Sequence, residues 1–375
     1  MKPIYFILTF LLLVSCSKDE SLKQDQEQEA ATRSFYMGFT AFPYDLTVEA
    51  QLDTYEKVAG LSDIFLTHLD HGVPWDEALN DLPFPTEVQQ TLAATKTGLA
   101  PNTKVLLTAT PTDQYRENLN TYWNNNGSHQ PLPPFWQQKT FDDPDVISAY
   151  IKYCKRIIDA VEPDYFAYAI ESNAAFRKED VAFTKFLSLA EAVYISLKSA
   201  YPNLPIFLTL QDRSFENSYK ELLETSKILL QYSDYIAMSS YPFLDYNNLN
   251  RDANPELFED NWLQDFRNLD AAKPFAISET GFCAEDLVIA NLGVNVKASE
   301  AWQNDYMIKL FDSANTLEAE FIAWFVFRDY DQLYDKTPNP PDILKVWRDN
   351  GLLDGQGNQR PAYQKWQEWK ALSKD

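Results

Sequence analysis

The chain has 375 residues, of which 45% are hydrophobic and 14% aromatic, which is enough apolar material for one large domain or two ordinary ones. A formal net charge of -23 disfavours nucleic acid and other polyanions as partners, and it suits a neutral or cationic ligand or serves solubility alone. The three cysteines, Cys16, Cys154 and Cys283, are too few for a disulfide framework, and we expect Cys154 and Cys283 to be buried thiols.

The N-terminus has the pattern of a secretory signal. Lys2 is followed by an apolar run from Ile4 to Val14, which is too short to span a bilayer comfortably. The letters LVSC, ending at Cys16, resemble the lipobox of bacterial lipoproteins, and SKDE after them resembles the acidic signal for the outer cell surface. The resemblance implies lipidation of Cys16, a membrane anchor through that lipid, and an outer-membrane location on the cell surface or the periplasmic face.

Three segments follow from this pattern. We assign residues 1–16 to the signal peptide and lipobox and residues 17–33 to a flexible tether, because the tether has too few large apolar side chains to order itself. Residues 34–372 are predicted to form one folded domain, which we expect to be a monomer.

Apolar runs rich in aromatic and β-branched residues then recur along the chain and predict eight strands. They are 35–43, 63–70, 104–111, 164–171, 205–211, 234–242, 274–280 and 320–328. Helix-period segments lie between them, for example at 47–60, 143–161, 179–200 and 218–231, with Thr47 and Asp143-Pro144 as helix starts.

Eight strand–helix units with nearly continuous apolar strands predict an α/β fold, a single (β/α)8 TIM barrel. An open doubly wound sheet also alternates but usually has fewer strands. The first strand is followed by GFTAFPYD, which has one glycine and no phosphate-binding pattern, so no nucleotide cofactor is expected.

The connection after the third strand, about 30 residues from Pro111 onward, is unusually long. Its aromatic residues, which include Trp123 and Trp136, argue against disorder. These indoles and Trp75 either stack on sugar rings or pack the loops together.

Polar and aromatic side chains follow the predicted strands at their carboxyl ends, where a barrel assembles its site. They are His68, Asp70, Glu171, Asn173, Gln211, Tyr241, Glu279, Trp324 and Asp329. Counting back by two places Ala169 and Ala167 in the barrel interior below Glu171, and Ile277 and Phe275 below Glu279.

Glu171 and Glu279 end the fourth and seventh strands, so the two carboxylates can face each other across the barrel mouth. Such a pair can cleave a glycosidic bond: one protonates the leaving oxygen, and the other attacks the anomeric carbon or activates water. This chemistry needs no metal and no cofactor.

The chain resembles the clan A glycoside hydrolases over residues 35–369, through AIESN at Glu171, ISETGF at Glu279, MSSYPF at Tyr241 and IAWFVF at Trp324. The resemblance implies a retaining glycosidase with Glu171 as acid/base, Glu279 as nucleophile, Tyr241 touching the nucleophile and Trp324 flooring the sugar pocket. His68, Asp70, Asn173, Gln211 and Asp329 complete the expected substrate contacts. ISETGF and SSYPF loosely resemble endo-β-1,4-galactanases.

One departure keeps alternatives open. Ile170 stands where many clan members carry the Asn that binds the sugar 2-hydroxyl, and Asn173 or His68 are the candidates to replace it. The expected function is hydrolysis of β-linked neutral oligo- or polysaccharides. The alternatives are a non-catalytic glycan-binding lipoprotein, or a metal-dependent hydrolase that uses His68 and His71.

Overall fold

The computed structural model describes residues 31–97, 99–213, 217–245, 247–258 and 262–375. The predicted signal peptide, lipobox and most of the tether lie outside these residues. Thr32–Asp375 form one unit by their internal contacts. In the described part of the chain, no helix combines the length and the apolar character that a bilayer crossing requires.

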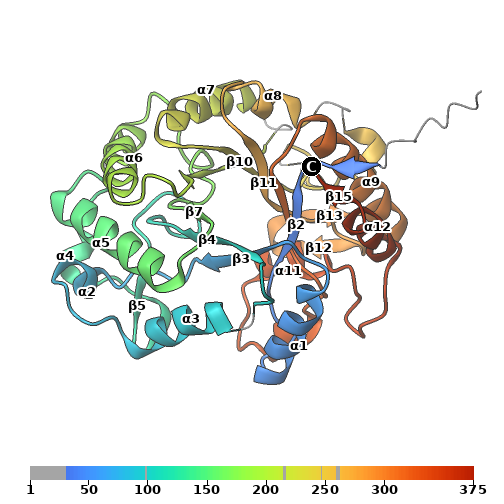
Figure 1. The fold of residues 1–375 in the computed structure, drawn as a ribbon, viewed down its shortest axis with the longest axis horizontal. Coiled ribbons are helices and arrows are strands. Elements are labelled where there is room, and N and C mark those ends of the chain that lie inside the picture. The colour runs from blue at the N-terminus through green and yellow to red at the C-terminus, as the bar shows by residue number, and fades with distance from the viewer. Residues whose placement is uncertain (1–30, 98, 214–216, 246, 259–261) are drawn as a thin grey trace, which may run out of the picture. The chain divides into compact units, whose positions relative to one another are not determined.

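The centre of this unit is a parallel sheet that is nearly closed into a barrel (Figure 1). Its strands, among the described residues, are β2 (Tyr36–Thr40), β3 (Ile64–Leu69), β4 (Lys104–Ala109), β7 (Tyr165–Ala167), β8 (Ile206–Phe207), β9 (Thr209–Gln211), β10 (Ile236–Ser240), β11 (Phe275–Thr280) and β14 (Phe321–Trp324). β8 pairs with β7 and β9 pairs with β10, yet both belong to one chain segment interrupted at Leu208. The nine strands therefore act as eight, and the predicted (β/α)8 barrel is confirmed.

Helices surround the barrel (Figure 1). They are α1 (Val48–Ala59), α2 (Trp75–Leu79), α3 (Thr86–Thr97), α4 (Pro134–Gln137), α5 (Pro144–Val161), α6 (Val181–Ala200), α7 (Tyr219–Leu229), α8 (Gln264–Arg267), α9 (Glu300–Thr316), α10 (Asp331–Lys336), α11 (Lys345–Arg348) and α12 (Pro361–Lys370). The predicted starts are confirmed: the Thr47 side chain accepts from Ala50 N, and the Asp143 side chain accepts from Asp145 N.

The barrel interior is filled by large rings from some strands and alanines from others. Tyr165 on β7 and Phe321 on β14 meet with ring centroids 5.1 Å apart, which only an approach across the interior allows. Ala167, predicted to point inward, belongs to this interior cluster, whereas the same prediction for Ala169 is wrong because Ala169 packs in the outer core. Because side chains alternate along a strand, the next inward positions lead up to the carboxyl ends of the strands.

Strand β11 breaks this alternation with a bulge. Met238 on β10 pairs with Ile277, but the next residue, Ser239, pairs with Glu279, which leaves Ser278 as an extra residue. Ala276 points into the barrel, whereas Phe275 and Ile277 pack in the outer core, so the prediction that those two share the interior is wrong. The bulge nevertheless turns Glu279 back toward the mouth.

The long connection after β4 is ordered and packs on the loop after β3. It contains the hairpin β5 (Tyr122–Asn124) and β6 (Gly127–Gln130) and the short helix α4. The indoles of Trp75, Trp123 and Trp136 are fully buried there and donate to Asn120 O, Glu87 and Asp76. Of the two roles considered for these residues, the structure therefore supports loop packing.

Three peripheral features complete the unit. The short strands β1 (Thr32–Arg33) and β15 (Ser373–Lys374) pair, so both ends of the described chain lie side by side (Figure 1). β12 (Leu287–Ile289) and β13 (Val294–Val296) form a hairpin before α9. Cys154 and Cys283 are buried free thiols, as predicted, and burial raises the pKa of each.

Candidate active site

Glu279 lies at the carboxyl end of β11 between two polar side chains. Its carboxylate accepts a short hydrogen bond from the Tyr241 hydroxyl and pairs with His68 Nε2 at 3.1 Å. Burial raises the pKa of Glu279, but His68, Tyr241 and Arg116 outweigh burial and hold that pKa below its ordinary value. Glu279 is therefore an ionised, oriented carboxylate, the state that a nucleophile requires.

His68 projects from β3, and its pKa is set by the same contact. Burial lowers the pKa of His68, but Glu279 and Asp70 more than offset this and raise it above the ordinary value. Burial and the neighbouring Glu279 also raise the pKa of the Tyr241 phenol well above its ordinary value, so the phenol stays a donor. Both groups thus hold the negative charge of Glu279 in place.

Glu171 follows β7 with a positive φ of 49°, in the left-handed region that a residue with a side chain rarely adopts. Its backbone N–H donates to Thr209 Oγ1 at 2.8 Å. The side chain accepts from Ser239 Oγ at 2.5 Å and from Arg116 Nη2 at 3.4 Å. Contacts from β9, β10 and the loop after β4 therefore fix this carboxylate at the mouth.

The two carboxylates share a neighbour. Ser239, which donates to Glu171, is the register partner of Glu279 on the adjacent strand. Adjacent strands lie about 4.8 Å apart. The side chains of Glu171 and Glu279 are therefore brought to one place, where they can act on one substrate bond.

Arg116 is the site residue that the sequence analysis missed. It pairs with Asp70 at 3.0 Å and with Glu171 at 3.4 Å, and its side chain is 11% exposed. Burial lowers the pKa of Arg116, but the negative charges of Asp70 and Glu171 outweigh burial and raise that pKa above its ordinary value. Burial raises the pKa of Asp70, and Arg116 brings that pKa below its ordinary value. The one available signal was a lone arginine in the long loop after β4.

Several predicted contacts are not available to a ligand. Asn173 is fully buried, and its amide bonds Gln211 N, Gln211 O and Ser226 Oγ. Asn173 therefore has a structural role, and the prediction that it contacts the substrate is wrong. Gln211 remains partly exposed, although its Oε1 accepts from Arg213 Nε at 2.6 Å.

Trp324 and Asp329 also lie away from the mouth. Trp324 is fully buried, its indole N–H donates to Asn350 O, and its ring packs near Tyr306 of α9, because its strand neighbour Ala323 takes the inward position. Asp329 is 1% exposed and is held by Arg360 and Gly351 N. Trp324 therefore does not form the predicted floor of the sugar pocket, and Asp329 does not make the predicted contact with substrate.

A different aromatic group borders the mouth. Phe42 after β2 and Phe325 after β14 are partly exposed and lie 5.4 Å apart. Trp347 of α11, also partly exposed, packs edge-on to Tyr241 at 6.0 Å. These rings can present a surface to the C–H face of a sugar. Residue alternation on β14 makes Phe325, not Trp324, the ring on the mouth side.

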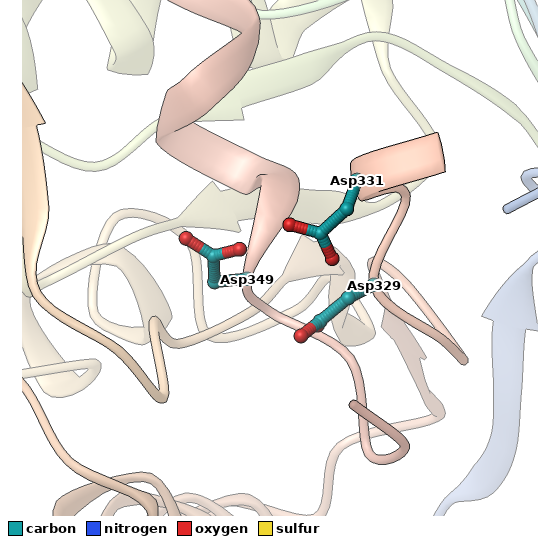
Figure 2. A group of neighbouring side chains, drawn as sticks. All are labelled: Asp329, Asp331 and Asp349. Atoms are coloured by element: carbon teal, nitrogen blue, oxygen red, sulfur yellow. The ribbon is translucent and has the colours of Figure 1, made fainter. Parts of the chain in front are cut away.

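Among the described residues, His68 and His71 do not belong to a group with metal-ligand geometry. His71 stacks on Trp123 at 4.9 Å, away from the pairing of His68 with Glu279. Within the described residues, the one group with metal-ligand geometry is Asp329, Asp331 and Asp349, whose carboxylate oxygens lie within 4.8 Å of one another (Figure 2). Arg360 pairs with Asp329, and Arg348 pairs with Asp331 and Asp349. Arginine side chains of the protein therefore already contact all three negative charges of this cluster.

The fold is a (β/α)8 barrel with two carboxylates at its mouth, and solved glycoside hydrolases share this fold. A GH5_18 glutamate-to-alanine variant from Streptomyces cattleya, in complex with Manβ1-4GlcNAc, aligns with a TM-score of 0.62 at 12% identity, over 90% of this chain and 81% of that one. The exo-β-1,4-mannosidase from Opitutaceae bacterium strain TAV5 also has a TM-score of 0.62 at 12% identity, over 91% and 59%.

A β-D-glucuronidase from Dictyoglomus thermophilum aligns less closely, with a TM-score of 0.52 at 15% identity, over 92% of this chain and 51% of that one. No protein-family model and no curated protein matches the chain. At these low sequence identities, the similarity to the solved structures supports the fold alone.

Proposed function

We propose that this protein is a retaining β-glycoside hydrolase in which Glu171 is the acid/base and Glu279 the nucleophile. The observation that carries the proposal is the pairing of Glu279 with His68 and Tyr241, one strand away from a second carboxylate that Ser239 holds. An ionised carboxylate beside a second carboxyl group is the arrangement that double displacement requires.

In the first step, Glu279 attacks the anomeric carbon while the bond to the leaving oxygen breaks. Glu171 gives its proton to that oxygen, so the leaving group departs as a neutral alcohol. His68 and Tyr241 orient the attacking carboxylate, and their contact weakens as its charge passes into the ester bond.

In the second step, water attacks the glycosyl ester and loses a proton to Glu171. The bond from sugar to Glu279 breaks, Glu279 regains its charge, and the configuration of the sugar is retained. Tyr241 and His68 then bind the released carboxylate again. The protein finishes with Glu171 protonated and Glu279 ionised, as it began.

For the substrate, we propose a neutral β-linked glycan, with β-1,4-mannosides first among the candidates. Two of the aligned structures are a complex with Manβ1-4GlcNAc and an exo-β-1,4-mannosidase. The acidic chain and the partly exposed rings at the mouth fit a neutral sugar. The finer resemblance to endo-β-1,4-galactanases stays a prediction, so β-1,4-galactan belongs in the same panel.

The test is an assay of purified protein on Manβ1-4GlcNAc, β-1,4-galactan and aryl β-glycosides, with Glu171→Gln and Glu279→Gln beside it. We expect release of sugar by the wild type alone, with the β-anomer seen first by proton NMR. Full activity in both variants would overturn the residue assignment, and a first-formed α-anomer would replace retention by inversion.

A second candidate, a glycan-binding protein without catalysis, is favoured by one observation. Ile170 is 2% exposed, and the amide of Asn173 is already bonded within the protein, so neither supplies a hydroxyl contact beside Glu171. Saturable glycan binding by calorimetry with no product over days, across the same panel, would select this candidate.

For location, we propose a lipid anchor on Cys16 and a position at the outer membrane, on the basis of the lipobox pattern. Radiolabelled palmitate should enter the wild-type chain and not a Cys16→Ala variant. Protease added to intact cells should remove the protein if it faces outward and spare it if it faces the periplasm.

A further inference from the structure

Strand alternation alone does not direct Glu171 to the mouth. β7 ends at Ala167, whose side chain belongs to the interior cluster, but Ala169, two residues further on, packs in the outer core. A strand that kept its alternation would place both side chains on one face. Glu171 itself has a positive φ of 49°. The direction of its carboxylate therefore depends on contacts from the neighbouring strands.

Thr209 on β9 holds the backbone on both sides of Glu171. Thr209 N donates to Ala169 O at 2.9 Å, and Ser172 N donates to Thr209 O at 2.8 Å. Between them, the N–H of Glu171 donates to Thr209 Oγ1 at 2.8 Å. A residue with a side chain keeps a positive φ only where its surroundings fix it. Thr209 therefore holds the turn that presents the carboxylate.

Ser239 on β10 holds one oxygen of this carboxylate. Ala237 belongs to the interior cluster, so alternation directs Ser239, two residues further on, toward the mouth. Ser239 is 1% exposed, and its Oγ donates to Glu171 Oε1 at 2.5 Å. This distance is at the short end of the range of about 2.5–3.0 Å for such bonds. Oε1 of Glu171 is therefore bound within the protein.

The other oxygen of Glu171 is held less closely. Arg116 Nη2 lies 3.4 Å from Oε2, which is longer than the usual N–H···O distance of about 2.9 Å. The Glu171 side chain is 16% exposed. A proton donor works best when its proton already points at the leaving oxygen. Because the bond from Ser239 prevents the carboxyl group from rotating, it leaves Oε2 as the oxygen that a ligand meets.

We propose that Ser239 is a positioning residue that, together with Thr209, orients Glu171 so that Oε2 exchanges the proton with the substrate. The inference rests on the proposed function. In the first step, the proton passes from Oε2 to the glycosidic oxygen as the bond from that oxygen to the anomeric carbon breaks. In the second step, Oε2 takes a proton from the attacking water. Oε1 keeps its hydrogen bond from Ser239 in both steps.

The test compares kcat/KM for the dinitrophenyl and the phenyl β-glycoside of one sugar. Dinitrophenolate leaves without a proton, whereas phenolate depends on the acid. Ser239→Ala should lower kcat/KM for the phenyl glycoside by roughly 10- to 100-fold, part of the about 10²–10⁴-fold that a positioned acid contributes. The value for the dinitrophenyl glycoside should stay within about twofold of the wild type. A merely structural role would lower both values by the same factor.

The matched control is Ser240→Ala. Ser240 is the next residue of β10, is fully buried, and donates to Asp212 Oδ2 instead of Glu171. This variant should keep the wild-type ratio of the two kcat/KM values. Ser239→Thr retains a hydroxyl group and should recover part of the loss on the phenyl glycoside.

Thr209→Val is the second variant, because it removes the acceptor of the Glu171 N–H and keeps the shape of the side chain. It should show the same selective loss on the phenyl glycoside. If Ser239→Ala does not fold, the ratio of the two kcat/KM values in Thr209→Val decides.

Azide tests the second step. Azide attacks the anomeric carbon of the glycosyl ester as the bond to Glu279 breaks, and it has no proton for a base to remove. Azide should therefore raise kcat of Ser239→Ala on the dinitrophenyl glycoside and leave the wild-type kcat unchanged.

The outcomes separate the inference from the proposed function. An active wild type with equal losses on both glycosides in Ser239→Ala and Thr209→Val, or with no loss in either variant, would overturn the inference alone. A wild type that cleaves neither glycoside, nor any member of the glycan panel, would reject the proposed function and the inference with it.

Discussion

Arg360 and Arg116 each pair with more than one carboxylate, and the two groups of carboxylates differ in whether a ligand can contact them. Arg360 is 1% exposed and pairs with Asp329, Glu285 and Glu300 under the loops that follow β14. Arg116 is 11% exposed and pairs with Asp70 and Glu171 at the mouth. Asp329, the buried partner of Arg360, is held within the protein, whereas Glu171, a partner of Arg116, lies at the mouth where a ligand can contact it.

The comparison shows that an ion pair does not by itself mark a functional site. Asp329 was predicted to bind substrate because it follows a strand, but its oxygens are held by Arg360 and Gly351 N. Glu171 follows a strand in the same way and keeps one long contact, 3.4 Å, to its cation. Substitutions in the two networks should therefore have different effects on activity and on stability.

The largest effect is expected at the mouth. Glu279→Gln should lower kcat by a factor on the order of 10⁴ or more, because an amide cannot form the glycosyl ester. The melting temperature should change little. Glu285→Gln, which alters a half-exposed partner of Arg360, is the matched control and should retain wild-type kcat. Equal losses in the two variants would remove the distinction between the networks.

The closed network should govern stability. Arg360→Met leaves Asp329 buried without its cation. Burial already raises the pKa of Asp329 to about 8, so the loss of unfolding free energy should grow as the pH rises above 8, toward about 3–5 kcal/mol. Urea unfolding measures this loss, and kcat per folded molecule should stay near the wild-type value. Adding Asp329→Asn to Arg360→Met should recover part of the stability, since the unpaired charge is gone. A loss of kcat without a loss of stability would place Arg360 in the site.

Tyr241→Phe tests the support of Glu279 with packing on Trp347 retained. Loss of a hydrogen bond to a charged group costs about 1.5–3 kcal/mol, which corresponds to roughly 10- to 100-fold in kcat. The Tyr241 contact helps to lower the pKa of Glu279, so the acidic limb of the pH profile should move to higher pH. An unmoved acidic limb would separate Tyr241 from the nucleophile.

The smallest effect concerns His68 and pH. The folded-state pKa of His68 is raised, so protonated His68 stabilises the fold below its unfolded pKa of about 6.5. This contribution is lost as pH rises through the folded pKa. The unfolding free energy of the wild type relative to His68→Gln should therefore fall as the pH rises above about 6.5 and through the folded-state pKa. A difference that is flat or rises with pH contradicts the pairing with Glu279.

Local patterns in the sequence were sufficient for the barrel. Alternating strands and helices predicted the (β/α)8 fold, and the caps at Thr47 and Asp143 lie where propensity placed them. The strand-end rule also brought Glu171, Glu279, Tyr241 and His68 to one mouth. These features depend on residue period and on the chain direction of parallel strands, which a sequence displays directly.

Contacts between distant residues decided the rest. Arg116 reaches Glu171 from a loop 55 residues away, and no local pattern reveals which way that loop folds. The bulge at Ser278 reversed the alternation below Glu279, and Ala323 took the inward place that would have let Trp324 face the mouth. Asn173 and Asp329 were used by partners from other elements. Sequence thus determined that Glu171, Glu279, Tyr241 and His68 come to the mouth. Tertiary packing decided that Arg116 joins them and that Trp324 and Asp329 do not.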